Sequence, residues 1–216
     1  TREGIERSKE WEKLYGGKVG KNDPTVYGRD WYLDANNRKI GVRHYDPYDY
    51  LVKDVAVAQT HNVSVNGKSG KTTFNIGLGY LDQDGMNKAA KEDNFKRYNA
   101  SINLTTEFNK WITLKAGAIY SKREKSYPYN ATGVFDPWYY CYRWSDIYPM
   151  GTDENGNELR SPASEFSQAN TAKMTRNYTN INMGLHLNIL KGWTADFDYS
   201  HANQEYIWLR RGTRFT

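Results

Sequence analysis

After residue 60, apolar and polar residues alternate with a period of two in several separate stretches of the chain. This period is typical of a β-strand with one apolar and one polar face. A short stretch, 61–67, places Val63 and Val65 on one face between Asn and Ser residues. The longer stretches with apolar residues at alternate positions are 74–80, 98–108, 112–120, 181–189 and 193–199. The pattern predicts about six antiparallel strands.

The connections between these strands alternate in length. The short ones, at 67–70, 109–110 and 190–192, suit tight hairpins. The long ones are polar stretches at 82–94 and 122–176. An antiparallel meander with these connections has short turns at one end and long loops at the other, as bacterial outer-membrane β-barrels do.

Aromatic residues mark both ends of the predicted strands. Membrane barrels concentrate such residues at the two membrane interfaces, where a ring is half apolar and half wet. Ten steps separate Tyr98 from Phe108, about the number that a tilted strand needs to cross the hydrocarbon core. The predicted membrane-interface aromatics are Tyr80, Tyr98 and Tyr120 on the long-loop side, and Phe108, Trp111 and Trp193 on the short-turn side.

A soluble β-sandwich explains the alternation equally well, because its strands bury one face against a second sheet. The strand lengths, the uneven connections, the aromatic rims and an opposite face rich in Asn, Ser, Thr and Gly favour a membrane barrel. Six strands are too few to close a barrel, and a solute-carrying lumen needs about 16 or more. The predicted fold is therefore all-β, an antiparallel meander of about six long strands forming part of a large transmembrane β-barrel with long extracellular loops.

Composition and charge exclude several other classes of protein. The 216 residues are 38% hydrophobic, and no stretch approaches the roughly 20 apolar residues of a membrane helix. An aromatic content of 15% argues against disorder of the whole chain. The net charge of +5 comes from scattered basic residues rather than from a stripe, so no nucleic acid partner is expected. The single Cys141 excludes an internal disulfide.

Residues with the chemistry of catalysis or metal binding lack the spacing that such sites need. The acidic stretch 153–158 departs from the calcium-loop pattern, and the four His show no ligand spacing. Asp196 and Asp198 would lie about 7 Å apart on one strand face, near glycosidase spacing. A polar lumen wall explains this pair better than an outer-membrane enzyme does. We expect no catalytic residue, no metal and no cofactor.

A series of short motifs resembles the barrel of SusC/RagA-type TonB-dependent outer-membrane transporters, in the same order and spacing. A further resemblance is an aromatic loop in which a Pro-led aromatic run and an Arg precede Tyr148-Pro149. The similarity is good from about residue 55 to 150. The matching segments are 59–67, 71–74, 78–85, 95–100, 109–111, 135–143 and 147–149.

The resemblance implies an active importer in the outer membrane of a Gram-negative bacterium, with no enzymatic activity. Family members carry oligosaccharides or peptides through a barrel of about 22 strands that holds a plug. The implied partners are TonB acting through the plug, a SusD-like surface lipoprotein that moves like a lid, the transported substrate and outer-membrane lipid. The chain would be an internal barrel segment. The alternative is a soluble β-sandwich that binds carbohydrate or acts as an adhesin.

Aromatic residues crowd the long connection between the fourth and fifth strands, from Tyr127 through Phe135 to Tyr148. Flat aromatic faces stack on sugar rings and also anchor protein interfaces. Packing of the loop on itself is a third explanation. The predicted substrate or lid contacts are Trp138, Tyr139, Tyr140, Tyr142 and Trp144.

The chain therefore divides into four predicted parts. Residues 1–58 form an extracellular loop region, with a short surface helix near 3–13 and Asp46-Pro47 as loop punctuation. The remaining parts are four barrel strands at 59–121, a long aromatic-rich extracellular loop at 122–175, and two further strands with the start of a loop at 176–216.

Overall fold

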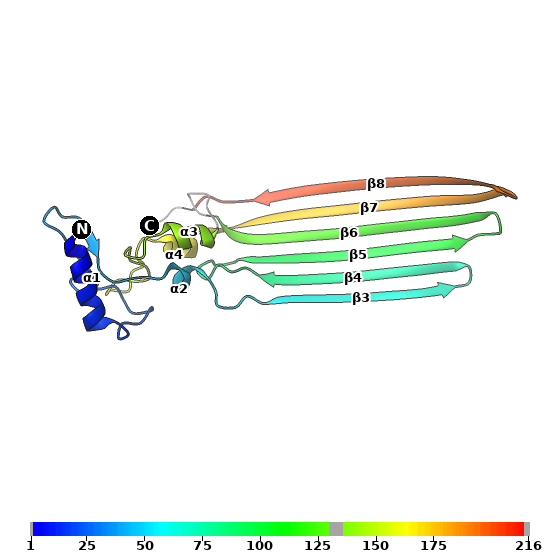
Figure 1. Ribbon diagram of the computed structural model, residues 1–216. Coiled ribbons are helices and arrows are strands. Elements are labelled where there is room, and N and C mark those ends of the chain that lie inside the picture. The colour runs from blue at the N-terminus through cyan, green and yellow to red at the C-terminus, as the bar shows by residue number, and fades with distance from the viewer. Residues whose placement is uncertain (1, 130–135, 214–216) are drawn as a thin grey trace.

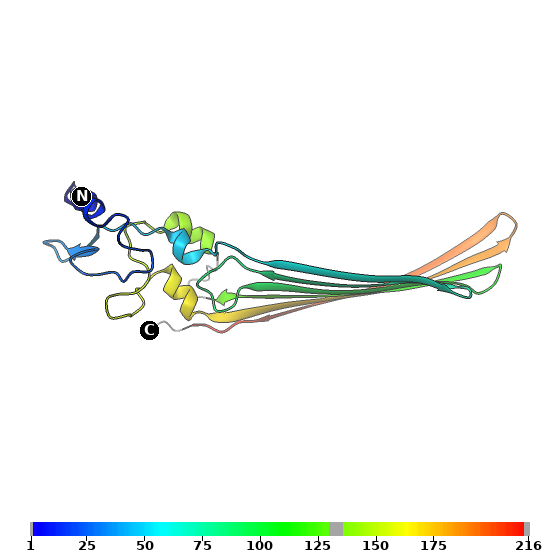
Figure 2. The ribbon, with the colours of Figure 1, turned by 90° about the horizontal axis from the view of Figure 1, so that it is seen from below.

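The computed structural model describes residues 2–129 and 136–213. A long, twisted sheet makes up most of the molecule, and four helices with the N-terminal segment gather at one of its ends (Figures 1 and 2). No helix in the described ranges has the length and apolar character needed to cross a membrane. In chain order the elements are α1 (Arg2–Tyr15), β1 (Trp31–Leu33), β2 (Lys39–Gly41), α2 (Pro47–Leu51), β3 (Ala58–Ser69), β4 (Thr72–Asp84), β5 (Asn94–Glu107), β6 (Ile112–Tyr129), α3 (Pro137–Arg143), α4 (Pro162–Gln168), β7 (Asn170–Leu190) and β8 (Trp193–Leu209).

The main sheet has the strand order β3-β4-β5-β6-β7-β8, and every neighbouring pair is antiparallel. This confirms the predicted six-stranded meander. Positive φ angles at Gly70 (59°) and Gly192 (86°) allow the chain to reverse tightly between β3 and β4 and between β7 and β8. In the third hairpin, the Asn109 side chain accepts from the backbone N–H groups of Trp111 (2.8 Å) and Ile112 (2.9 Å), which fixes the turn.

The strands extend further toward the long loops than the alternating pattern predicts. β6 continues to Tyr129 and β7 begins at Asn170, so the expected boundaries at 121/122 and 175/176 fall inside strands. β8 likewise runs to Leu209. The stretch 122–126 carries polar residues on both faces, and the stretch 206–209 carries apolar or aromatic residues on both faces. Neither stretch therefore shows the period of two that identifies a half-apolar strand.

The four helices, the small β1-β2 hairpin and their loops form a unit at the long-loop end of the sheet, which we call the cap (residues 2–57, 85–93 and 136–169). Its separate segments are joined by backbone hydrogen bonds. Tyr45 N donates to Asp146 O (2.7 Å), and Lys53 N donates to Met86 O (2.9 Å). The long loops are therefore ordered against the N-terminal segment.

Three cap helices begin with the same local chemistry, a polar N-cap followed by proline. Asp46 and Asp136 accept hydrogen bonds from backbone N–H groups of α2 and α3, and Ser161 forms a capping box with Ser164 at α4. Proline suits the first helical position because its missing N–H has no partner there anyway. Asp46-Pro47 thus starts a helix, and its interpretation as loop punctuation is wrong. The predicted N-terminal helix is confirmed as α1.

Candidate functional site

One face of the sheet is apolar and lies open along its length. Cross-strand neighbours on this face match apolar to apolar, as in Val63–Leu78 and Met183–Tyr199. Leu78 is 57% exposed and Met183 is 58% exposed. The described residues contain no second sheet that packs on this face, so it is a surface suited to lipid or to a partner rather than to water.

The predicted interface aromatics lie at the two ends of the sheet. Toward the cap, Tyr80 and Tyr98 are cross-strand partners whose ring centroids are 5.1 Å apart, and Tyr120 lies one pair of residues deeper on β6. At the hairpin end Phe108, Trp111 and Trp193 are exposed. Between Tyr98 and Phe108 the strand rises about 33 Å, or about 25 Å along the normal of a membrane for a tilted strand.

Charged side chains on the apolar face begin at the tyrosine row. Lys96 Nζ lies 3.4 Å from Asp82 Oδ2, and Lys122 Nζ lies 2.9 Å from Glu124 Oε1. In the strand register Lys122 is level with Tyr98, and the other three residues lie on its cap side. Toward the cap, this face therefore changes from apolar residues to aromatic residues and then to ion pairs. The same order is found from the hydrocarbon core to the headgroup region of a membrane.

The opposite face of the sheet is polar. Asn66, Asn75, Asn103 and Asn182 fall in one cross-strand row, with Gly117 between the last two. A Cβ atom at Gly117 would lie 2.5 Å from Asn182 Oδ1 and 2.9 Å from Asn103 Oδ1, so a larger residue at this position would force the two amide side chains to move. Such a face suits a water-filled interior.

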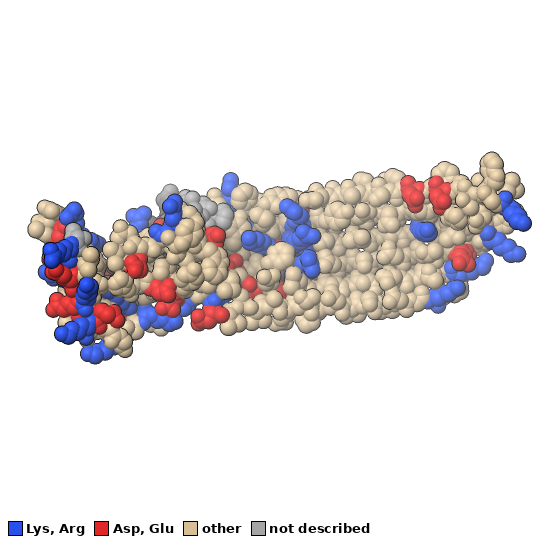
Figure 3. Space-filling view, in the orientation of Figure 1, with Lys and Arg blue, Asp and Glu red and all other residues tan. Residues whose placement is uncertain are grey.

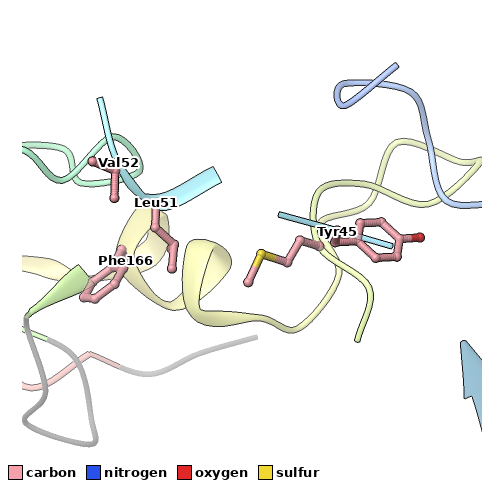
Figure 4. Close-up of a cluster of buried hydrophobic side chains, with 5 residues drawn as sticks. Tyr45, Leu51, Val52 and Phe166 are labelled. Carbon is pink, nitrogen blue, oxygen red and sulfur yellow. The ribbon is translucent and has the colours of Figure 1, made fainter. Parts of the chain in front are cut away.

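The cap has a conventional buried core made by the N-terminal segment and the long 136–169 connection together. Leu51 and Phe166 are fully buried, and Tyr140, Cys141 and Trp144 pack against this core. Figure 4 shows Phe166 close to Leu51 and Val52. Two of the five predicted contact aromatics, Tyr140 and Trp144, thus pack into the cap.

Burial in this unit shifts the pKa of several groups. Desolvation raises the pKa of Tyr45 to about 12, and burial also raises the pKa of the Cys141 thiol, with smaller contributions from the charges of Asp46 and Asp136. A raised thiol pKa keeps Cys141 protonated at neutral pH, which argues against a reactive cysteine.

The other predicted contact aromatics lie on the surface of α3. Tyr142 is 73% exposed and Trp138 is 44% exposed. Because they are four residues apart, they share one helix face. Trp138 meets the exposed Tyr48 edge-on, with ring centroids 5.8 Å apart, and Tyr139 lies under the Arg143 guanidinium at 5.4 Å. Phe135, part of the same aromatic run, lies outside the described residues.

A hollow of about 710 Å³ lies where α3 meets the cap end of the polar face. The side chains of Phe95, Lys125 and Trp138 contribute to its wall. In the strand register, Phe95 and Lys125 are cross-strand partners. The rest of the lining is Gln83, Asp84, Gly85, Met86, Asp93, Asn94, Tyr127, Asp136 and Pro137. A hollow with an aromatic ring and mixed polar groups is able to hold part of a polar solute.

A buried charge network, which no local sequence pattern signals, holds the N-terminal part of the cap. Asp30, with no exposed surface, accepts from Trp11 Nε1 (3.0 Å) and Val26 N (2.9 Å), and its Oδ2 lies 2.7 Å from Arg29 Nη2. The buried Arg43 lies 3.6 Å from the same oxygen. Burial by itself would raise the pKa of Asp30, but the hydrogen bonds outweigh it and the pKa is lowered.

The motifs considered for catalysis or metal binding have structural partners. Asp196 Oδ1 lies 2.7 Å from His186 Nδ1 on the neighbouring strand. Asp153 accepts from the backbone N–H groups of Asn155 (2.9 Å) and Asn157 (2.8 Å), a local turn that lowers its pKa. Within the described ranges, no group of three or more His, Cys, Asp or Glu side chains is placed to hold a metal ion.

Comparison with known proteins gives one similarity in sequence. Over 83 residues the chain is 32% identical to the TonB-dependent receptor SusC of Bacteroides thetaiotaomicron, a stretch that covers 38% of the chain and 8% of SusC. The matched stretch is thus a small part of the length of its curated relative. No protein-family model matches the chain.

Two solved structures align with nearly the whole chain at low identity. The RagAB peptide importer in its closed-closed state aligns with a TM-score of 0.49 and 18% identity, covering 94% of this chain and 23% of that chain. A second structure of the RagAB peptide transporter gives a TM-score of 0.46 and 18% identity, covering 94% of this chain and 22% of that chain.

Proposed function

We propose that this chain, which is homologous to the TonB-dependent receptor SusC, forms part of the wall and the extracellular mouth of an outer-membrane importer. The observation that carries the proposal is the apolar, exposed face of the sheet, bounded at both ends by aromatic residues and backed by a polar face. In lipid the apolar side chains are solvated by hydrocarbon, and the polar face lines the water-filled lumen. These residues have no enzymatic role in such a transporter.

The edges of the sheet support a larger barrel. Within the described residues, β3 pairs only with β4 and β8 pairs only with β7. The outer backbone groups of both edge strands therefore need partners, because an unpaired group in hydrocarbon costs several kcal/mol. Further strands of the same barrel supply those partners in this proposal.

The cap faces the cell exterior and meets the substrate and a lid. Trp138 lines the hollow above the polar face and contacts the solute, an oligosaccharide or a peptide. Tyr142, on the exposed surface of α3, contacts a SusD-like surface lipoprotein. TonB acts on a plug inside the barrel and does not touch these strands.

Labelling of intact cells tests the topology. In a Cys141→Ser background of the full-length protein, Glu154→Cys in the cap is expected to react with a membrane-impermeant maleimide added outside the cells. Ser69→Cys, exposed at a hairpin of the opposite end, reacts only after the outer membrane is opened. Equal labelling of both positions in intact cells, or recovery of the protein in the soluble fraction without detergent, contradicts the proposal.

A further inference from the structure

Three arginines stand side by side on the polar face of the sheet, one on each of three neighbouring strands. In the strand register Arg97 of β5 is opposite Arg123 of β6, and Arg123 is opposite Arg176 of β7. Residues directly opposite each other point to the same face, with Cα atoms about 5 Å apart. On the face seen in Figure 3, basic side chains form a column across the middle strands. We call these three residues the arginine row.

The arginine row lacks acidic partners. Among the ion pairs of the described residues, none involves Arg97, Arg123 or Arg176. Their neighbours are neutral: the Arg176 guanidinium lies 5.6 Å from the centre of the Tyr206 ring, and Asn99, in the amide orientation that satisfies its surroundings, accepts from Arg97 Nε at 3.2 Å. The nearby acids Asp82 and Glu124 belong to the opposite face, where they pair with lysines.

Like charges directly opposite each other on a sheet destabilise it, so an uncompensated row of three needs a reason. Arg123 and Arg176 are exposed, and Arg97 is half-buried. Guanidinium groups bind carboxylate and sulfate through two parallel hydrogen bonds, so the row presents several such forks side by side. Lys125 adds a fourth positive charge two residues closer to the cap on the same face and leads into the hollow beneath α3.

We propose that the arginine row binds the carboxylate or sulfate groups of an acidic oligosaccharide that enters through the hollow. The inference rests on the proposed function, since it requires the polar face to line a transport lumen. It goes further than the proposed function in two respects: the substrate is negatively charged, and the arginine row binds it. Trp138 and the row are complementary, because the ring stacks on a sugar while the guanidinium groups bind its acidic substituents.

The aromatic ring beside the row favours a glycan over a peptide. Trp138 lies in the wall of the hollow, and a flat aromatic face stacks well on a sugar ring. Lys125 lines the same hollow and lies two residues from Arg123 on β6, so the stacking ring and the basic groups belong to one continuous surface.

The test uses the full-length protein purified in detergent and three probes of matched length: oligogalacturonate, its neutral methyl ester and an oligoglutamate. Titration calorimetry measures their affinities. We expect wild-type protein to prefer the acidic glycan over its ester, and the triple variant Arg97→Gln, Arg123→Gln, Arg176→Gln to lose roughly tenfold to a hundredfold in acidic affinity while its affinity for the ester is unchanged. Raising the salt concentration reduces the preference in wild type only.

A matched control removes three positive charges elsewhere. Lys68→Gln, Lys110→Gln and Lys191→Gln lie exposed at the hairpin end, and this variant is expected to keep the acidic preference. The triple Arg→Lys variant keeps the charge but loses the planar fork, so it falls between wild type and the Gln variant. The single change Arg123→Gln gives the same direction with a smaller loss, should the triple variant fold poorly.

Two results overturn the inference: an unchanged ratio of acidic to neutral affinity in the Gln variant, or row-dependent binding of oligoglutamate but not of oligogalacturonate. Absence of binding by every probe overturns it as well. None of these three results changes the topology measured by cell labelling. The proposed function is contradicted only by the labelling and fractionation results described above, so the two claims are tested separately.

Discussion

The sheet and the cap place their apolar side chains in opposite ways. In the cap, apolar residues from distant segments turn inward, and Leu51 and Phe166 have no exposed surface. In the sheet, residues of the same kind turn outward, so that Phe197 is 60% exposed although it has cross-strand apolar neighbours. In the proposed transporter, the sheet therefore takes its order from ladder hydrogen bonds and from the surrounding lipid, whereas the cap depends on its own core.

The largest expected effect is loss of the cap core. Phe166→Ala removes a fully buried ring and is expected to destabilise the cap by about 4 kcal/mol, as large-to-small core changes do. Hydrogen exchange of the full-length protein should show lost protection in the cap and unchanged protection in β4 to β7. Phe197→Ala on the exposed face is the matched control. Equal effects of the two changes would remove the distinction between the regions.

Breaking the buried charge network is expected to be next in size. Asp30→Ala leaves the buried Arg43 without its acid and should cost about 3 kcal/mol in cap stability. Because the folded-state pKa of Asp30 is lowered, its contribution is complete above the ordinary value of about 3.9 and is lost as pH falls through the folded value. Urea unfolding of the cap should therefore show a stability difference between wild type and Asp30→Ala that shrinks from pH 6 to pH 2. A pH-independent difference would contradict this role.

A third experiment separates the two faces of one strand. Ile102→Arg places a charge on the apolar face between the aromatic rows and is expected to cost at least about 2 kcal/mol in a bilayer. Its neighbour Asn103→Arg points to the polar face and should be nearly neutral. Urea unfolding of the full-length protein in lipid vesicles measures both. A larger cost at residue 103 would reverse the assignment of the faces.

The smallest expected effect is at a helix cap. Asp136→Ala removes the acceptor for Trp138 N, at 3.0 Å, and should destabilise α3 by about 1 kcal/mol. Asp136→Ser retains a capping oxygen and should restore most of the loss. Hydrogen exchange of α3 is the readout, and no change in either variant would mean that packing alone holds this helix.

Part of this architecture was predictable because it is local. The alternation at 74–80 and 98–108 indicates strands without any knowledge of their partners, and short turns force those partners to be neighbours. The placement of Tyr98 and Phe108 at the ends of the apolar face follows from the same alternation, because the two residues are ten steps apart on one strand face. The sequence also carried a usable signal for α2, α3 and α4 in the dipeptides Asp46-Pro47, Asp136-Pro137 and Ser161-Pro162, although helices this short show no periodicity.

The rest required segments far apart in the chain to meet. The strand ends at 122–129 and 170–176 show no sustained alternation of apolar and polar residues, so only their pairing with each other identifies them as strands. Composition alone does not separate packed from exposed aromatics in the run 138–144. The core around Phe166 does, because Tyr140 packs against it and Tyr142 stays exposed. Strand register likewise brings the three arginines together, although 26 and 53 positions separate them along the chain.

By itself, then, the sequence determined which residues lie on the apolar face of the sheet and which lie on the polar face, because that choice repeats every two residues and needs no long-range contact. Tertiary structure decided how the long loops fold into a cap and which charges share a row. Those features depend on register and on packing between segments that are distant in sequence, and no local pattern encodes either of them.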